Sequence, residues 1–157
     1  MNTLTGEITT ITTEQNISLV KVLAGGQLFH SLILDTPDAS PWLKTGATVR
    51  VLFKETEVMI ALPADTPLQI SVRNQLPCHI TAIISGTILC ELTLALAAGS
   101  PGQPPASATT VPTRSDTSAQ STIKAIITRA ACDALSLKEN DPIIALIKTN
   151  EVSLAHD

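Results

Sequence analysis

The segment LKTGATVRVLFKETEVMIAL at residues 43–62 recurs as LKENDPIIALIKTNEVSLAH at residues 137–156. At this offset of 94 residues the two copies share Leu43/Leu137, Lys44/Lys138, Leu52/Leu146, Lys54/Lys148, Glu57/Glu151, Val58/Val152 and Ala61/Ala155. Upstream, NTLTGEITTI at residues 2–11 matches NQLPCHITAI at residues 74–83 at an offset of 72 residues. Such a repeat predicts one structural unit built twice. We place the first module at residues 1–66 and the second at residues 67–157.

The two offsets differ by 22 residues, so the second module carries an insertion. Residues 98–121, AGSPGQPPASATTVPTRSDTSAQS, are rich in Pro, Ser, Thr and Ala and lack apolar periodicity. Such a segment buries too little apolar surface to offset the entropy of ordering it, so we expect a long mobile loop. The first module makes the same connection through Ala24-Gly25-Gly26, which predicts a hairpin turn.

Alternating apolar residues with many β-branched side chains predict strands in both modules, at residues 17–23, 48–53, 88–94 and 143–147. One segment, residues 128–135, predicts a short helix with Thr128 as its N-cap. Two prolines shorten or break the matching segment of the first module, residues 36–42. We therefore expect an all-β protein of two tandem OB-like five-stranded β-barrels, each with one short helix. Barrels of about 65 residues are marginal alone, which favours subunit association.

Composition and charge argue against several classes of function. The net charge is −4 and only 2% of residues are aromatic, so the chain lacks the basic field and stacking platforms of nucleic-acid binders. We see no secretory signal and no apolar run of roughly 18 residues, which predicts a cytoplasmic protein without membrane association. The three cysteines lack metal-ligand spacing and predict reduced, buried thiols. Three isolated histidines without catalytic partners indicate no enzyme activity, no catalytic residue and no direct metal ligand.

Polar residues of the second module form a set of hydrogen-bond donors without a carboxylate. They lie in three segments: Ser71 to Gln75 between the modules, Thr128 at the helix start, and Lys148-Thr149 after a strand. A tetrahedral dianion accepts hydrogen bonds at four oxygens and donates none, so it suits such a set. Two other interpretations stay open. Arg73 fits a surface residue paired with a carboxylate, and Lys148 fits a solvated lysine at a strand end.

The first module keeps little of this set. It begins at Asn2, so it has no equivalent of residues 71–73, and Leu34 stands at the repeat position of Thr128. Only the lysine has a counterpart, Lys54. We therefore expect the strong ligand set in the second module.

At these residues the sequence resembles the Mop/TOBE family of molybdate-binding modules. The opening SARNQ motif of that family is similar to Ser71-Val72-Arg73-Asn74-Gln75. Three further motifs follow in the same order, at residues 127–131 (ITRAA), 135–141 (LSLKEND) and 145–152 (ALIKTNEV). The resemblance implies paired OB-like barrels that bind molybdate, or tungstate, at subunit interfaces of a homo-oligomer, where the SxRN segment of one subunit faces the Thr and Lys segments of another. The implied ligands are Ser71, Arg73, Thr128, Lys148 and the backbone N–H of Thr149.

Three residues are secondary candidates: Asn74, Lys54 and Ala131. Ala131 stands where the family often has a serine, so one hydroxyl donor is missing. Asn140 replaces the family's usual glycine, and we expect it to adopt a left-handed backbone conformation.

The resemblance favours reversible cytoplasmic binding of molybdate or tungstate for storage or homeostasis, with no organic cofactor. Two alternatives stay open. One is a ligand-sensing or oligomerisation module of a molybdate-responsive transcription regulator. The other is a structural oligomerisation module whose anion site has decayed.

Overall fold

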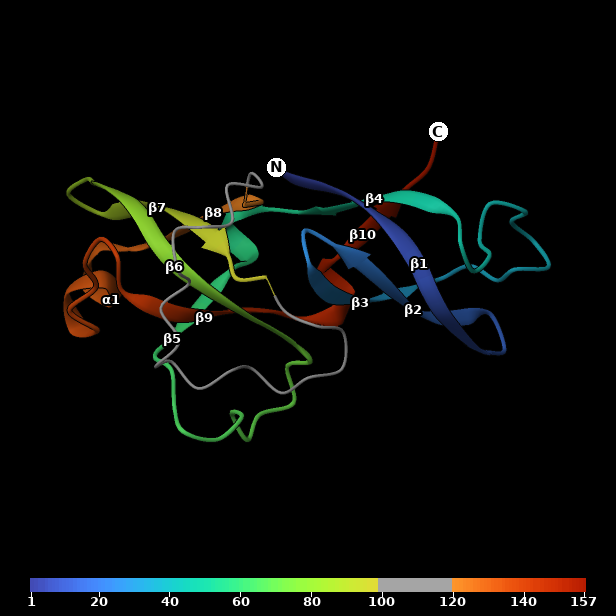
Figure 1. Ribbon diagram of the computed structural model, residues 1–157, viewed down its shortest axis with the longest axis horizontal. Coiled ribbons are helices and arrows are strands. Elements are labelled where there is room, and N and C mark those ends of the chain that lie inside the picture. Colours follow the sequence, from blue (N-terminus) through green and yellow to red (C-terminus); the bar gives the residue numbers. More distant parts are fainter. Residues whose placement is uncertain (99–119) are drawn as a thin grey trace.

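The computed structural model describes residues 1–98 and 120–157, and these form two curled five-stranded antiparallel sheets (Figure 1). Residues 99–119 of the expected mobile loop lie outside the described residues. The strands are β1 (Asn2–Glu14), β2 (Ile17–Ala24), β3 (Gln27–Ile33), β4 (Thr48–Phe53), β5 (Met59–Ala61), β6 (Asn74–Ser85), β7 (Leu89–Leu96), β8 (Thr122–Thr128), β9 (Pro142–Ile147) and β10 (Ser153–Ala155). The helices are the 3-10 turns η1 (Glu55–Glu57) and η2 (Thr149–Glu151), and the α-helix α1 (Arg129–Ala134).

The structure confirms the internal repeat, and the two modules share even the register shift in their first strands. β1 and β6 each carry a register shift at the same repeat position, immediately after Ile8 and Ile80. In both modules this isoleucine exchanges two backbone hydrogen bonds with the loop that leads into β4 or β9. Each loop passes through a left-handed residue, Gly46 with φ 89° and Asn140 with φ 72°. The expected left-handed conformation of Asn140 is therefore confirmed, and it fits the tolerance of Asn for this region.

The short helix differs between the modules. In the second, α1 forms as expected, and the hydroxyl of Thr128 accepts a hydrogen bond from the Ala131 N–H at 3.1 Å. In the first, the matching segment forms turns, in which the amides of Ala39 and Ser40 both donate to the Thr36 carbonyl. The two prolines there, residues 37 and 41, lack amide hydrogens and so cannot continue a helix.

The modules exchange their last strands. β5, which follows the first module's β4, pairs with β9 in the order β5-β9-β6-β7-β8. β10, which follows β9, pairs with β4 in the order β10-β4-β1-β2-β3. The chain therefore crosses between the sheets twice, through η1 and through η2. The expected boundary between residues 66 and 67 lies in the linker that joins β5 to β6.

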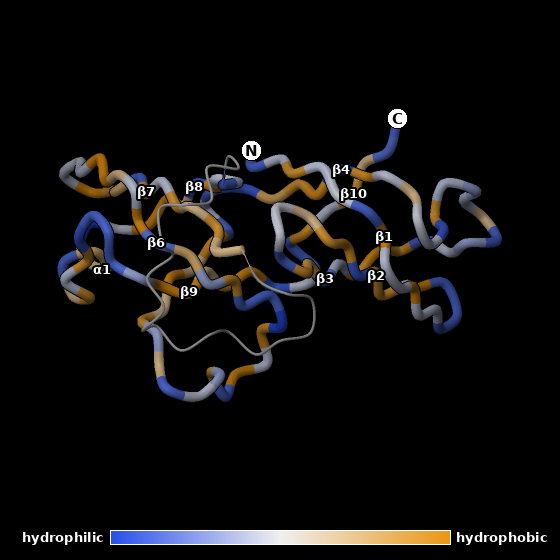
Figure 2. The backbone as a smooth tube through the Cα atoms, in the orientation of Figure 1, coloured by the Kyte–Doolittle hydropathy of each residue, from blue (hydrophilic) through white to orange (hydrophobic). Residues whose placement is uncertain are grey.

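One continuous apolar core runs through both sheets. Its largest side chains include Phe29 and Phe53, whose ring centroids lie 5.8 Å apart. Figure 2 shows the hydrophobic segments along the strands and the hydrophilic ones in most of the loops. The three cysteines are free and buried, as expected, and burial raises the pKa of the Cys78 thiol to about 12.

Two buried asparagines fasten the sheets to each other. Asn2 hydrogen-bonds both backbone groups of Lys124 on β8, each at 2.8 Å. Its repeat counterpart Asn74 does the same to His30 on β3, accepting from the N–H at 2.6 Å and donating to the carbonyl at 2.9 Å. A side-chain amide has both an acceptor oxygen and N–H donors, so it can bond the N–H and the carbonyl of the same backbone residue. Each module's first strand is thus held against the other module's third strand.

Strand exchange makes the first sheet depend on the end of the second module. A chain that stops after Val152 lacks β10, so β4 becomes an edge strand that pairs only with β1. We expect faster hydrogen–deuterium exchange of the β4 amides, measured by mass spectrometry, because their ladder partners Ser153 to Ala155 are gone. A chain that lacks only residues 156–157 is the control. Equal exchange of β4 in both chains would show that β10 does not protect this strand.

Candidate functional site

Arg73 and Lys148 leave the second sheet at the same point. The ladder between β6 and β9 ends at the pair Asn74–Ile147. Arg73 comes directly before Asn74, and Lys148 comes directly after Ile147. Both side chains are exposed. Thr149 follows as the first residue of η2, so its N–H has no partner within that turn. We call this group, Arg73, Asn74, Lys148 and Thr149, the second junction.

The cations of the second junction have no carboxylate partner among the described residues. The ion pairs among the described residues join other groups, namely Met1–Glu55, Arg50–Asp157, Lys124–Glu91 and Arg129–Asp133. One guanidinium nitrogen of Arg73 donates to the Ile70 carbonyl, which leaves most of its five donors available. The pairing of Arg73 with a carboxylate, left open by the sequence, is therefore not observed.

The linker before β6 adds a hydroxyl and a hollow. Ser71 is exposed but lies in a bend, because β6 begins only at Asn74. Residues 71–73 therefore lie outside the strand, and buried Val72 separates the two exposed side chains of Ser71 and Arg73. Arg73 lines a hollow of about 370 Å³ with linker residues 67–70 and Gln75.

Thr128 lies far from the second junction within one chain. It pairs with Leu89 at the start of β7, beside the β6–β7 hairpin, whereas Arg73 precedes the opposite end of β6. The 12 residues of β6 lie between them, which corresponds to roughly 35 Å along the strand. One chain therefore brings together Arg73, Lys148 and Thr149, but it does not add Thr128.

The secondary candidates have different environments. Asn74 is fully buried and its side chain is engaged by His30, so it positions the junction and is not free to contact a ligand. The backbone N–H of Ala131 donates to the hydroxyl of Thr128, the N-cap of α1. Because a hydroxyl can accept and donate at once, Thr128 still has its own hydrogen to donate.

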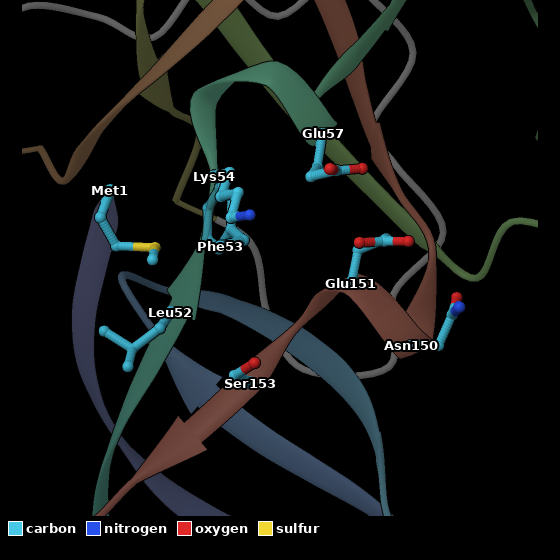
Figure 3. A pocket seen from close by; sticks show the side chains of 8 residues that line it. All are labelled: Met1, Leu52, Phe53, Lys54, Glu57, Asn150, Glu151 and Ser153. Carbon is cyan, nitrogen blue, oxygen red and sulfur yellow. The ribbon is translucent and has the colours of Figure 1, made fainter.

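Lys54 lies at the equivalent point of the other module, which we call the first junction: Met1, Asn2, Lys54 and Glu55. It lines a hollow of about 320 Å³, whose other lining residues include Glu57 and Glu151 (Figure 3). Figure 3 shows these two carboxylates on facing segments next to Lys54. Two carboxylates that line one hollow disfavour the binding of an anion there.

Two basic residues near the second junction were not identified from the sequence. His30 is half-buried on β3, where Asn74 holds its backbone, and Lys21 on β2 is its ladder partner. Burial lowers the pKa of His30, and the charges of Lys21 and Arg73 lower it further, although the Asn74 side chain opposes them. The position of His30 beside Asn74 depends on how the modules pack, which no local motif encodes.

This fold is similar to that of ModG, a cytoplasmic molybdate-binding protein. The crystal structure of ModG with molybdate bound aligns with 99% of this chain and 96% of that chain, with a TM-score of 0.78 and 22% sequence identity. At this identity the match with ModG establishes a shared fold of two modules. No family model matches the sequence, and no curated protein matches it.

Within residues 1–98 and 120–157 no helix is long and apolar enough to cross a membrane. The same residues contain no group of three or more His, Cys, Asp or Glu side chains that could hold a metal ion.

The lowered pKa of His30 predicts a loss of stability in acid. The unfolded chain takes up a proton near the ordinary value of 6.5, whereas the folded chain does so only at lower pH. The free energy of unfolding should therefore fall as the pH drops through 6.5 towards the folded value. His30→Gln should flatten this dependence in denaturant titrations between about pH 7 and pH 5. His79→Gln is the control, and an unchanged slope in the His30 variant would contradict the assignment.

Proposed function

We propose that this chain binds molybdate, or tungstate, reversibly at the second junction and serves the storage or homeostasis of that oxyanion in the cytoplasm. The observation that carries this proposal is the convergence of Arg73 and Lys148 at one end of the second sheet, where neither pairs with a carboxylate of residues 1–98 or 120–157. The shared fold with ModG, solved with molybdate bound, supports the same ligand.

The chemistry of the junction matches a tetrahedral dianion. Arg73 offers a planar fork of N–H donors, Lys148 a compact positive charge, and Thr149 a backbone N–H. Ser71 adds a hydroxyl two residues before Arg73. The groups of Arg73, Lys148 and the Thr149 backbone N–H only donate hydrogen bonds, so they offer no acceptor to the proton of singly protonated phosphate and favour fully ionised molybdate.

A second copy of the chain completes the site in this proposal. Thr128 lies at the far end of the second module, next to three exposed apolar side chains: Ile84 at 68%, Ile88 at 75% and Leu89 at 51% exposure. Figure 2 shows hydrophobic residues at this hairpin end. Exposed apolar side chains gathered at one end favour burial against another surface. Docking of this end near the second junction of a neighbouring copy would place Thr128 beside Arg73, as the family resemblance implies.

Isothermal titration calorimetry with sodium molybdate tests the proposal. Arg73→Ala should weaken binding by roughly tenfold or more, because a charge-assisted, forked contact to the dianion is lost. Arg50→Ala is the matched control: Arg50 is also exposed, but it lies on β4 and pairs with Asp157 at 3.4 Å. We expect the control to bind molybdate with wild-type affinity.

Two results would count against this function. The absence of molybdate and tungstate binding by the wild-type protein would exclude the oxyanion role. Equal affinity in wild-type protein and the Arg73 variant would move the site away from the second junction.

A further inference from the structure

The 3-10 turns of the two junctions have the same backbone conformation. Lys54 and Lys148 each precede a 3-10 turn, with φ/ψ of −78°/147° and −65°/145°. Val58 and Val152 end these turns with φ/ψ of −87°/118° and −97°/118°. Beside each turn, the asparagine at the start of the module's first strand fastens the other module's third strand. The two turns therefore differ in their side chains and not in their backbone path.

One difference is at the first residue of each turn. The repeat places Glu55 where the second junction has Thr149. The Glu55 carboxylate contacts the Met1 ammonium, and that hydrogen bond lowers the pKa of Glu55. The nearby charge of Lys124 lowers this pKa further. Glu55 is therefore ionised at neutral pH and already interacts with the cations around it.

Leu34 adds a second difference between the modules. It stands at the repeat position of Thr128 and is 82% exposed, so the first module also lacks that hydroxyl. The first junction thus keeps the lysine and the turn but carries a carboxylate at the first residue of that turn. A fixed carboxylate repels an incoming dianion and competes for the same positive charges.

We propose that the Glu55 carboxylate excludes oxyanions from the first junction by charge repulsion. Each chain then contributes one anion-binding junction, the second. This inference rests on the proposed function, because it assumes that the second junction binds molybdate. It assigns to Glu55 a role in determining the number of sites, which the shared two-module fold leaves open.

A reciprocal exchange tests the role of Glu55. In Glu55→Thr the first junction acquires the residue of the second, and calorimetry should show a higher ratio of bound molybdate to chain. In Thr149→Glu the second junction acquires the carboxylate, and molybdate affinity should fall by roughly tenfold or more. Glu55→Gln, which removes the charge and keeps the shape, should raise the ratio as Glu55→Thr does. Glu14→Thr, on an exposed strand end, is the control for loss of one negative charge and should leave the ratio unchanged.

The outcomes separate this inference from the proposed function. Wild-type protein that binds no molybdate would overturn both. Wild-type protein that binds molybdate, with an unchanged ratio in both Glu55 variants, would overturn only the role of Glu55. A ratio raised equally by Glu14→Thr would also overturn it, because overall charge would then explain the effect.

Discussion

The reciprocal exchange of β5 and β10 is the constraint on which the rest of the structure depends. Each module completes its sheet with a strand supplied by the other. The chain must therefore cross between the sheets after β4 and again after β9, and it does so in a single 3-10 turn each time. The asparagine contacts to β3 and β8 fix the remaining freedom between the sheets. Lysines 54 and 148 are held at the two crossing points as a consequence.

This arrangement gives the molecule two equivalent positions that have diverged in charge. The backbone of each junction is set by the crossing, so a side-chain change alters binding without altering the fold. The second junction presents an arginine and a lysine that no described carboxylate pairs with. The first presents Lys54 among carboxylates. Of the two junctions, the second therefore suits an anion, whereas the first already contains the carboxylate of Glu55.

Much of the fold follows from the sequence because the repeat carries local signals. The hairpin turn at Gly25-Gly26, the cap at Thr128 and the left-handed Asn140 are each encoded by residues near them in the chain. Strand exchange is not encoded in this way. A short strand after β4 has the same sequence pattern whether it pairs within its module or with β9, and only three-dimensional packing decides between them.

For the candidate site, the sequence indicates the chemistry of the donor groups but not their arrangement in space. Arg73 and Lys148 were identified as donors from their residue types, and their shared ladder end brings them together. The position of Thr128 at the other end of β6 could not be read from spacing, since β6 and β8 lie far apart in sequence. His30 belongs to the first module, and its backbone is held at the second junction by the side chain of Asn74.

Anomalous X-ray diffraction at the molybdenum absorption edge, from crystals grown with molybdate, tests the central claim most directly. The account predicts a molybdenum peak within hydrogen-bond reach of Arg73 and Lys148, with Thr128 of a neighbouring copy completing the contacts. A molybdenum peak at the first junction alone, or anywhere out of reach of Arg73, would contradict it.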